Sequence, residues 1–162
     1  MKHLEVVAAI INYNDLILCM QRPVGKFDYV SLKFEFPGGK VEPGETNSQA
    51  LMRELREEMA MTTDITEDDY FMTVIHQYPD FEITMHSFIC PVESQEFIRK
   101  EHVDHKWLPV EELKSLDWAP ADQPIVNAAD CILLGLGLPT SEISIISSAS
   151  SRARREIFSR RR

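Results

Sequence analysis

The sequence predicts an α+β fold in which a mixed β-sheet lies between helices, an α/β/α sandwich. Two observations lead to this prediction. Short apolar runs typical of strands alternate along the chain with segments of helical periodicity. A chain of 162 residues, 44% of them hydrophobic, is also long enough to bury one core without disulfides or a structural metal. The composition excludes fibrous, collagen-like and wholly disordered proteins.

The first part of the chain is expected to form a β-hairpin followed by a short strand. Residues 6–11 and 16–20 are apolar runs on either side of the turn-compatible segment 12–15. Residues 34–36 read as a third strand, which Pro37, Gly38 and Gly39 are expected to end. The hairpin supplies the first two strands of the sheet.

Residues 46–59 form the clearest predicted helix. Thr46 and Gln49 fit a capping box, in which each side chain bonds the backbone amide of the other residue. Leu51, Leu55 and Met59 recur every four positions and give the helix one apolar stripe. This stripe predicts that the helix packs on the sheet through one face.

The second half of the domain is expected to supply three strands and two helices. The predicted strands are 70–77, 83–92 and 105–108, and the predicted helices are 110–116 and 121–133. Residues 1–133 are therefore expected to be the folded domain, with residues 134–162 as a Ser- and Arg-rich extension outside its core.

Charge, cysteine content and hydropathy set the expected surroundings of the protein. The formal net charge is −9, which argues against bulk affinity for nucleic acid or anionic lipid. Cys19, Cys90 and Cys131 are widely spaced and form no CxxC pair, so reduced thiols are expected. The sequence shows no signal peptide and no apolar run of bilayer length. We expect a cytoplasmic protein with no membrane and no nucleic acid as partner.

Acidic residues gather in one segment, GGKVEPGETNSQALMRELREEMAM. At about 100° per residue, Glu57 and Glu58 lie within about 60° of Glu54 around the predicted helix, beside its apolar stripe. Glu42 and Glu45 precede the helix, so up to five carboxylates collect near its start. Like charges so close raise one another's pKa unless a cation neutralises them. Oxygen-only ligands suit Mg²⁺, or Mn²⁺ in its place, rather than zinc.

Other interpretations of this segment are weaker. A P-loop has Lys and then Ser or Thr where this chain has Glu45 and Thr46, and a carboxylate there would repel phosphate. No GxGxxG motif supports a dinucleotide site. The residues RELREE are also typical of a solvated helix with paired charges. The Gly-Gly loop and Glu45 ahead of the helix have no simple surface role, which favours a metal site.

The same segment resembles the Nudix box of the Nudix hydrolases. Gly39, Glu45 and the run from Arg53 to Met61 match that signature in type and spacing. One position differs, because Ala60 stands where the box usually has Gly, and Ala adopts a positive φ less readily. Similarity to the MutT branch, and to bacterial CTP pyrophosphohydrolases and 8-oxo-dGTP diphosphatases, extends to about residue 130 through EVVAAII, QRP, FEFPGGKVEPGE, YPDF, KEH and WAPAD.

This resemblance implies the Nudix fold and Mg²⁺-dependent hydrolysis of a nucleoside triphosphate to the monophosphate and pyrophosphate. The implied metal ligands are the Gly38 carbonyl, Glu54, Glu57, Glu58 and Glu101, and the implied catalytic set is Glu54, Glu101 and Arg53. Either Glu54 or Glu101 would orient or deprotonate the attacking water. Arg53 would fix the glutamates from behind without touching the substrate, and Glu45 would be a secondary ligand or a loop anchor.

The implied substrate-binding residues are Arg22, Phe36, Tyr78 and Asp122. Arg22 fits an exposed arginine equally well, and Phe36 and Tyr78 fit core or wall positions better than specific base contacts. His102 and His105 lie in the charged run KEHVDHKW, in which the resemblance implies a functional role for Glu101 alone, so a solvated loop is expected to hold both histidines.

Asp122 is the most informative position for base preference. The MutT branch has Asn in the corresponding segment, whereas an ionised Asp only accepts hydrogen bonds. An acceptor favours a base with an exocyclic amine, cytosine or adenine. A protonated Asp could mimic Asn and admit an oxidised guanine. The structural alternative is that Asp122 caps the last predicted helix.

Three alternative functions remain open at this point. Hydrolysis of ADP-ribose or a dinucleoside polyphosphate is the first, because the box does not fix the substrate. A Nudix-fold binding module without catalysis is disfavoured by the intact box glutamates. Nucleic-acid binding through the Arg-rich extension is disfavoured because Phe158 is the one aromatic residue among its arginines.

Overall fold

A computed structural model describes residues 1–133, with side chains described through residue 129, so the predicted extension lies outside the described residues. The elements in chain order are β1 (Lys2–Tyr13), β2 (Leu16–Gln21), β3 (Phe34–Glu35), β4 (Gly38–Lys40), α1 (Asn47–Met59), the 3₁₀ helix η1 (Glu67–Asp69), β5 (Tyr70–Gln77), β6 (Phe81–Pro91), β7 (Asp104–Pro109), the 3₁₀ helix η2 (Val110–Ser115) and α2 (Gln123–Leu133). In this part of the chain no helix has the length and apolar character needed to cross a membrane.

The sheet is mixed, as the sequence predicts. Its main path runs β3-β2-β1-β6-β5, with β4 also paired to β1 and β7 to β2. β1 and β6 are parallel along their whole paired length, whereas the other pairs are antiparallel. The predicted hairpin joins β1 and β2 through Asn14 and Asp15, whose φ angles of 44° and 68° give the left-handed turn that tight hairpins favour.

Strand β4 is a correction to the sequence prediction. Gly38 and Gly39 were expected to end a strand, but they begin a new one that pairs with Val6–Ala8 of β1. A Cβ atom on Gly38 would overlap the carbonyl oxygen of Val7, so this close pairing depends on glycine. The pairing holds Gly38 and Gly39 beside β1, with Gly39 next to Glu54 of α1.

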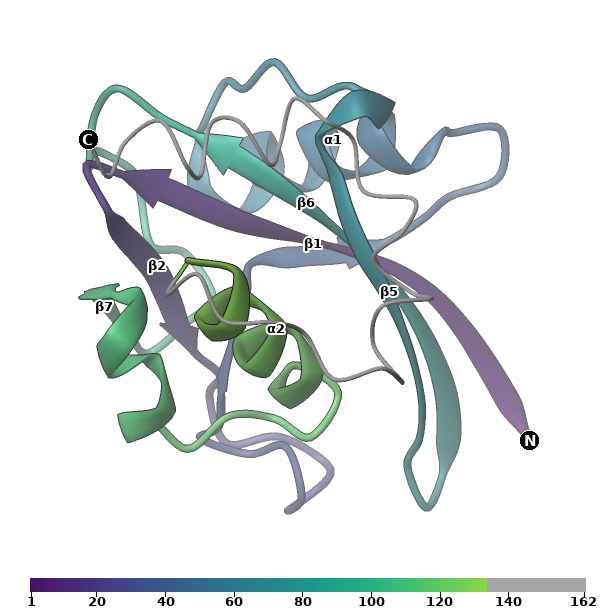
Figure 1. Cartoon of the computed structure of the whole chain (residues 1–162). Coiled ribbons are helices and arrows are strands. Elements are labelled where there is room, and N and C mark those ends of the chain that lie inside the picture. The colour runs from purple at the N-terminus through teal and green to yellow at the C-terminus, as the bar shows by residue number, and fades with distance from the viewer. Residues whose placement is uncertain (134–162) are drawn as a thin grey trace.

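Helices cover both faces of the sheet, which confirms the α/β/α prediction (Figure 1). Leu51 and Leu55 of α1 pack with Val7 and Ala9 on one face, and α2 and η2 pack with Ala8 and its neighbours on the other. The predicted helix over 110–116 is present as the 3₁₀ helix η2. It carries the apolar Val110 and Leu113, three residues apart, which both bury their side chains in a 3₁₀ turn.

Both ends of α1 follow from its local sequence. The Thr46 side chain accepts from the Gln49 amide and the Gln49 side chain accepts from the Thr46 amide, so the predicted capping box is present. Ala60 ends the helix in the left-handed region at φ 53°, and its amide donates to the Arg56 carbonyl. Helix α1 therefore ends in the left-handed conformation that glycine usually adopts at this position, although the residue is alanine.

The described thiols are free and buried. Cys19 and Cys90 form no disulfide among the residues described. Burial raises the pKa of each thiol to about 12. Both behave as small apolar core residues, as the sequence predicts.

Candidate active site

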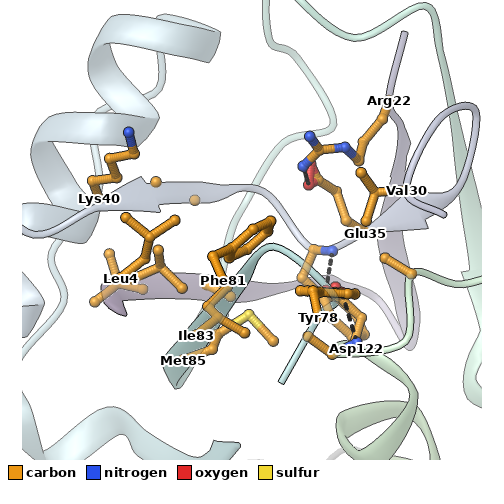
Figure 2. A pocket seen from close by; sticks show the side chains of 18 of the residues that line it. Leu4, Arg22, Val30, Glu35, Lys40, Tyr78, Phe81, Ile83, Met85 and Asp122 are labelled. Carbon is orange, nitrogen blue, oxygen red and sulfur yellow. Dashed lines mark hydrogen bonds and ion pairs between the residues drawn. The ribbon is translucent and has the colours of Figure 1, made fainter. Parts of the chain in front are cut away.

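A cavity of about 1010 Å³ brings most of the predicted site residues together. The predicted residues that line it are Arg22, Phe36, Gly38, Glu54, Glu58, Tyr78, Glu101 and Asp122. Arg53 and Glu57 are not among its lining residues. Figure 2 shows Arg22 beside Glu35 above Tyr78 and Asp122, with Lys40 and Leu4 across the cavity from them.

Arg53 organises the carboxylates behind the cavity. Its Nε and Nη2 donate to the two oxygens of Glu45 at 2.7 and 2.9 Å, and Nη1 donates to Glu54 at 2.9 Å and Glu57 at 3.1 Å. Nη2 also reaches the Lys40 carbonyl at 2.9 Å. These bonds hold the pKa of Glu45 below its usual range and that of Arg53 above it. Glu45 is thus a loop anchor, one of the two roles expected for it.

Glu54 is the most enclosed carboxylate of the box. Its side chain is 14% exposed and lies directly over Gly39, where a Cβ atom would overlap the carboxylate. Burial raises the pKa of Glu54 against the opposing effect of Arg53, and the charges of Glu57 and Glu42 add to the increase. A carboxyl group with a raised pKa takes up a proton more readily than an exposed glutamate does.

Glu58 of α1 lies against Glu101 from the loop between β6 and β7. Burial, a hydrogen bond with Glu101 and the charges of Glu101 and Glu54 raise the pKa of Glu58. Two contacts tie this loop to the end of α1: the Ile98 amide donates to the Met59 carbonyl at 2.9 Å, and Lys100 Nζ donates to the Glu57 carbonyl at 2.9 Å. The loop therefore delivers Glu101 to the box helix across a long sequence separation.

The donor set fits a hard divalent cation. Within the described residues no three His, Cys, Asp or Glu side chains form a closed ligand group. Mg²⁺ does not need such a group, because it keeps several waters and usually takes one or two protein carboxylates. Glu58 and Glu101 form a carboxyl pair that a cation would stabilise, with Glu54 in the same cavity. Glu57 is 57% exposed and turned toward Arg53.

Asp122 joins the cavity to helix α2. Its Oδ1 accepts from the Phe36 amide at 3.0 Å (Figure 2). Its carbonyl accepts from the Val126 amide at 3.1 Å. The residue thus begins the helix with its backbone, while its side chain bonds to the segment after β3. Burial, followed by the charge of Glu35, raises the pKa of Asp122 well above its usual value. The carboxyl is neutral over a range in which an exposed Asp is ionised.

Phe36 and Tyr78 are wall residues of the cavity and members of the core at once. Phe36 stacks on Trp118 with ring centroids 4.7 Å apart. The Tyr78 hydroxyl accepts from the Ala121 amide at 3.0 Å, and its ring stacks on Tyr29 at 5.1 Å. Burial raises the pKa of Tyr78 to about 12. Both rings therefore have packing partners in the core as well as a face on the cavity.

Two cavity residues were missed by the sequence analysis. Glu35 lines the cavity, and Arg22 Nη1 donates to its two oxygens at 3.2 and 3.3 Å. His102 also lines the cavity, with Nε2 at 3.5 Å from Glu35 Oε1, so the solvated-loop prediction is wrong for it. His105 packs on Phe97 outside the cavity. A carboxylate between two aromatic residues, just before the Gly-Gly segment, was the available signal for Glu35.

The fold and the site together define a class of protein. A mixed sheet lies between helices, and the acidic side of α1, packed against Gly39, faces a cavity large enough for a nucleotide. The NUDIX domain matches residues 1–129. The chain therefore belongs to the Nudix family and is a hydrolase that acts on phosphoanhydride bonds.

Named relatives agree with this class. The chain is 39% identical over 128 residues to a CTP pyrophosphohydrolase of Escherichia coli K12, covering 79% of this chain and 92% of that protein. It is 33% identical over 127 residues to an 8-oxo-dGTP diphosphatase of the same strain, covering 78% and 95%. The solution structure of the E. coli ORF135 protein superposes with a TM-score of 0.67 at 38% identity, covering 79% of this chain and 89% of that one.

Proposed function

We propose that this chain is a Mg²⁺-dependent (deoxy)nucleoside triphosphate pyrophosphohydrolase that releases the monophosphate and pyrophosphate and prefers CTP or dCTP. The observation that carries the proposal is one cavity lined both by Glu54, Glu58 and Glu101 and by a separate polar pair, Glu35 and Asp122. The first group suits cation-bound phosphates and the second suits the polar edge of a base. The relative named CTP pyrophosphohydrolase supports this substrate class.

The proposed metal ligands are the Gly38 carbonyl, Glu54, Glu57, Glu58 and Glu101, with Mg²⁺ as the ion and Mn²⁺ as a substitute. Bound Mg²⁺ would neutralise the polyphosphate and lower the pKa of a water molecule. Arg53 keeps Glu54 in place from behind. Because Oε1 of Glu54 already accepts from Arg53, Oε2 is the oxygen that would take the proton of the attacking water.

Base preference in this proposal rests on Glu35 and Asp122. The Glu35 carboxylate, paired with Arg22, accepts a hydrogen bond from an exocyclic amine. A neutral Asp122 donates to an adjacent ring nitrogen, so the two groups together match the amine and ring nitrogen of cytosine. A neutral Asp122 also supports a second candidate, oxidised guanine, and a relative is named for 8-oxo-dGTP.

The proposed setting is the cytoplasmic nucleotide pool. The few, widely spaced cysteines, with no CxxC pair, support a reducing compartment. The proposed partner is the small-molecule nucleotide itself.

A turnover panel with Mg²⁺ tests the proposal. CTP, dCTP, 5-methyl-dCTP, 8-oxo-dGTP, dGTP and ADP-ribose are compared by kcat/KM, with pyrophosphate measured as product. Glu58→Gln and Glu57→Gln are each expected to lower kcat at least about 10²-fold, as loss of a charge-stabilising group does. Turnover retained in both variants would overturn the metal assignment, and preference for ADP-ribose would overturn the substrate class.

A further inference from the structure

His102 lies between the two groups of side chains in the cavity. Its neighbour in sequence, Glu101, contacts Glu58, while its own Nε2 lies 3.5 Å from Glu35 Oε1. The His102 side chain is 15% exposed and lines the cavity. Two consecutive residues thus make different closest contacts: Glu101 with Glu58 of the acidic helix, and His102 with Glu35, although the charge of His102 also acts on Glu58.

Arg22 by itself holds Glu35 weakly. A single guanidinium nitrogen, Nη1, contacts both carboxylate oxygens, and the Arg22 side chain is 41% exposed. A single-nitrogen contact fixes the plane of a carboxylate less well than a two-nitrogen bidentate pair, and exposed ion pairs contribute little. His102 reaches Glu35 Oε1 from another segment of the chain and is better buried than Arg22, so it supplies a second contact that restrains this carboxylate.

The loop that carries His102 is anchored without its ring. The Ile98 amide bonds the Met59 carbonyl and Lys100 bonds the Glu57 carbonyl on one side of it. On the other side the Val103 amide donates to the Gln21 carbonyl at 3.0 Å. These three bonds use no atom of the imidazole, so the ring is not required to place Glu101.

We propose that His102 is a positioning residue for base selection: together with Arg22 it holds the Glu35 carboxylate toward the exocyclic amine of the base. The inference rests on the proposed function and deepens it by naming a residue that sets substrate preference. It separates two adjacent residues by role, since Glu101 serves phosphate chemistry and His102 serves discrimination among bases.

The test compares CTP with UTP, which differ in the exocyclic group, an amine against a carbonyl, and in the proton on the adjacent ring nitrogen; the double variant below isolates the part that acts through Glu35. His102→Leu is expected to lower the CTP/UTP ratio of kcat/KM about tenfold, mainly through KM, because one of the two contacts that hold Glu35 is lost. The Mg²⁺ concentration for half-maximal rate is expected to stay within about twofold. His102→Gln, whose amide can still donate to Glu35, is expected to restore most of the ratio. His105→Leu, outside the cavity, is the matched control.

A double-mutant cycle with Glu35→Gln closes the test. If His102 acts through Glu35, adding His102→Leu to Glu35→Gln lowers the CTP/UTP ratio no further. An unchanged ratio in His102→Leu, or additive losses in the double variant, overturns the inference. Should His102→Leu fail to fold, His102→Asn, whose shorter amide cannot reach Glu35, takes its place against His102→Gln. A wild-type chain that hydrolyses neither nucleotide overturns the proposed function and the inference with it.

Discussion

Arg53 binds both carboxylate oxygens of Glu45, from Nε at 2.7 Å and Nη2 at 2.9 Å. This pair clamps the loop before α1 to the middle of the helix. The same guanidinium reaches Glu54 and Glu57, so one side chain sets the positions of three carboxylates. Arg53 therefore acts on the cavity without lining it.

Arg53→Lys is expected to lower kcat about 10- to 100-fold, because an ammonium cannot form the planar two-nitrogen contact. The free energy of unfolding is expected to fall by about 1–3 kcal/mol, since carboxylates lose their partner. Steady-state kinetics and urea denaturation measure the two effects. Arg56→Lys, on the exposed side of the same helix, is the control and is expected to change neither. Equal effects of the two substitutions would contradict the clamp.

Gly39→Ala is expected to displace the Glu54 carboxylate, because the new methyl group would occupy its place. A shift of about 1 Å in a reacting group costs about 10²-fold in rate, so kcat is expected to fall by that factor while the protein remains folded. Gly25→Ala is the control, since a Cβ there meets Ser31 Oγ at 4.0 Å. Normal kcat in Gly39→Ala would show that Glu54 need not sit over Gly39.

Ala60→Gly is expected to raise the free energy of unfolding by about 0.5–1 kcal/mol. Ala60 has φ 53°, which is costly for a residue with a Cβ atom and free for glycine. The residue is exposed, so no packing is lost. Urea denaturation measures the gain, and kcat is expected to stay within about twofold. Ala50→Gly, in the buried middle of α1, is expected to destabilise. A loss of stability in Ala60→Gly would contradict the strain argument.

Asp122→Asn is expected to become more stable relative to wild type as pH rises. The folded-state pKa of Asp122 is raised, so between its ordinary value and the folded-state value the unfolded chain has lost a proton that the folded chain keeps. Wild-type stability therefore falls with rising pH, by up to about 1.4 kcal/mol for each pH unit, and Asn does not titrate. Denaturation between about pH 5 and pH 8 measures the difference.

Asp68→Asn, at an exposed position, is the matched control for that pH series. In the Asp122→Asn variant the new amide oxygen can still accept from the Phe36 amide, so that hydrogen bond is retained. A stability difference that stays constant or shrinks as pH rises would show that the Asp122 carboxyl is ionised in the folded protein.

Local sequence was sufficient for the elements whose signals are local. The capping box at Thr46 and Gln49 and the hairpin turn at Asn14 and Asp15 involve neighbours in the chain, and both are present. The predicted helix over 110–116 is also present, and only the structure shows that it is a 3₁₀ helix, because the spacing of Val110 and Leu113 serves a 3₁₀ turn as well as an α-helix. Strand β4 was missed because its partner, β1, is distant in sequence.

The site residues also divide into those that local spacing predicts and those that only the folded chain brings together. The spacing of Glu54 and Glu58 on one helix follows from the sequence, and both line the cavity. The roles of Glu35 and His102 do not, because Glu35 is one polar residue in a short strand and His102 one of several charged residues in a loop. Only the folded chain brings the two within 3.5 Å.

By itself, the sequence determined the acidic helix, its cap and its family resemblance, because these depend on residue types at short, fixed spacings. The tertiary structure decided which of the carboxylates line the cavity, which of them bond Arg53, and that Asp122 is buried beside Phe36. The physical reason is that burial and pairing of charges depend on segments that the chain brings together only when β1, β4 and the loop before β7 pack against α1.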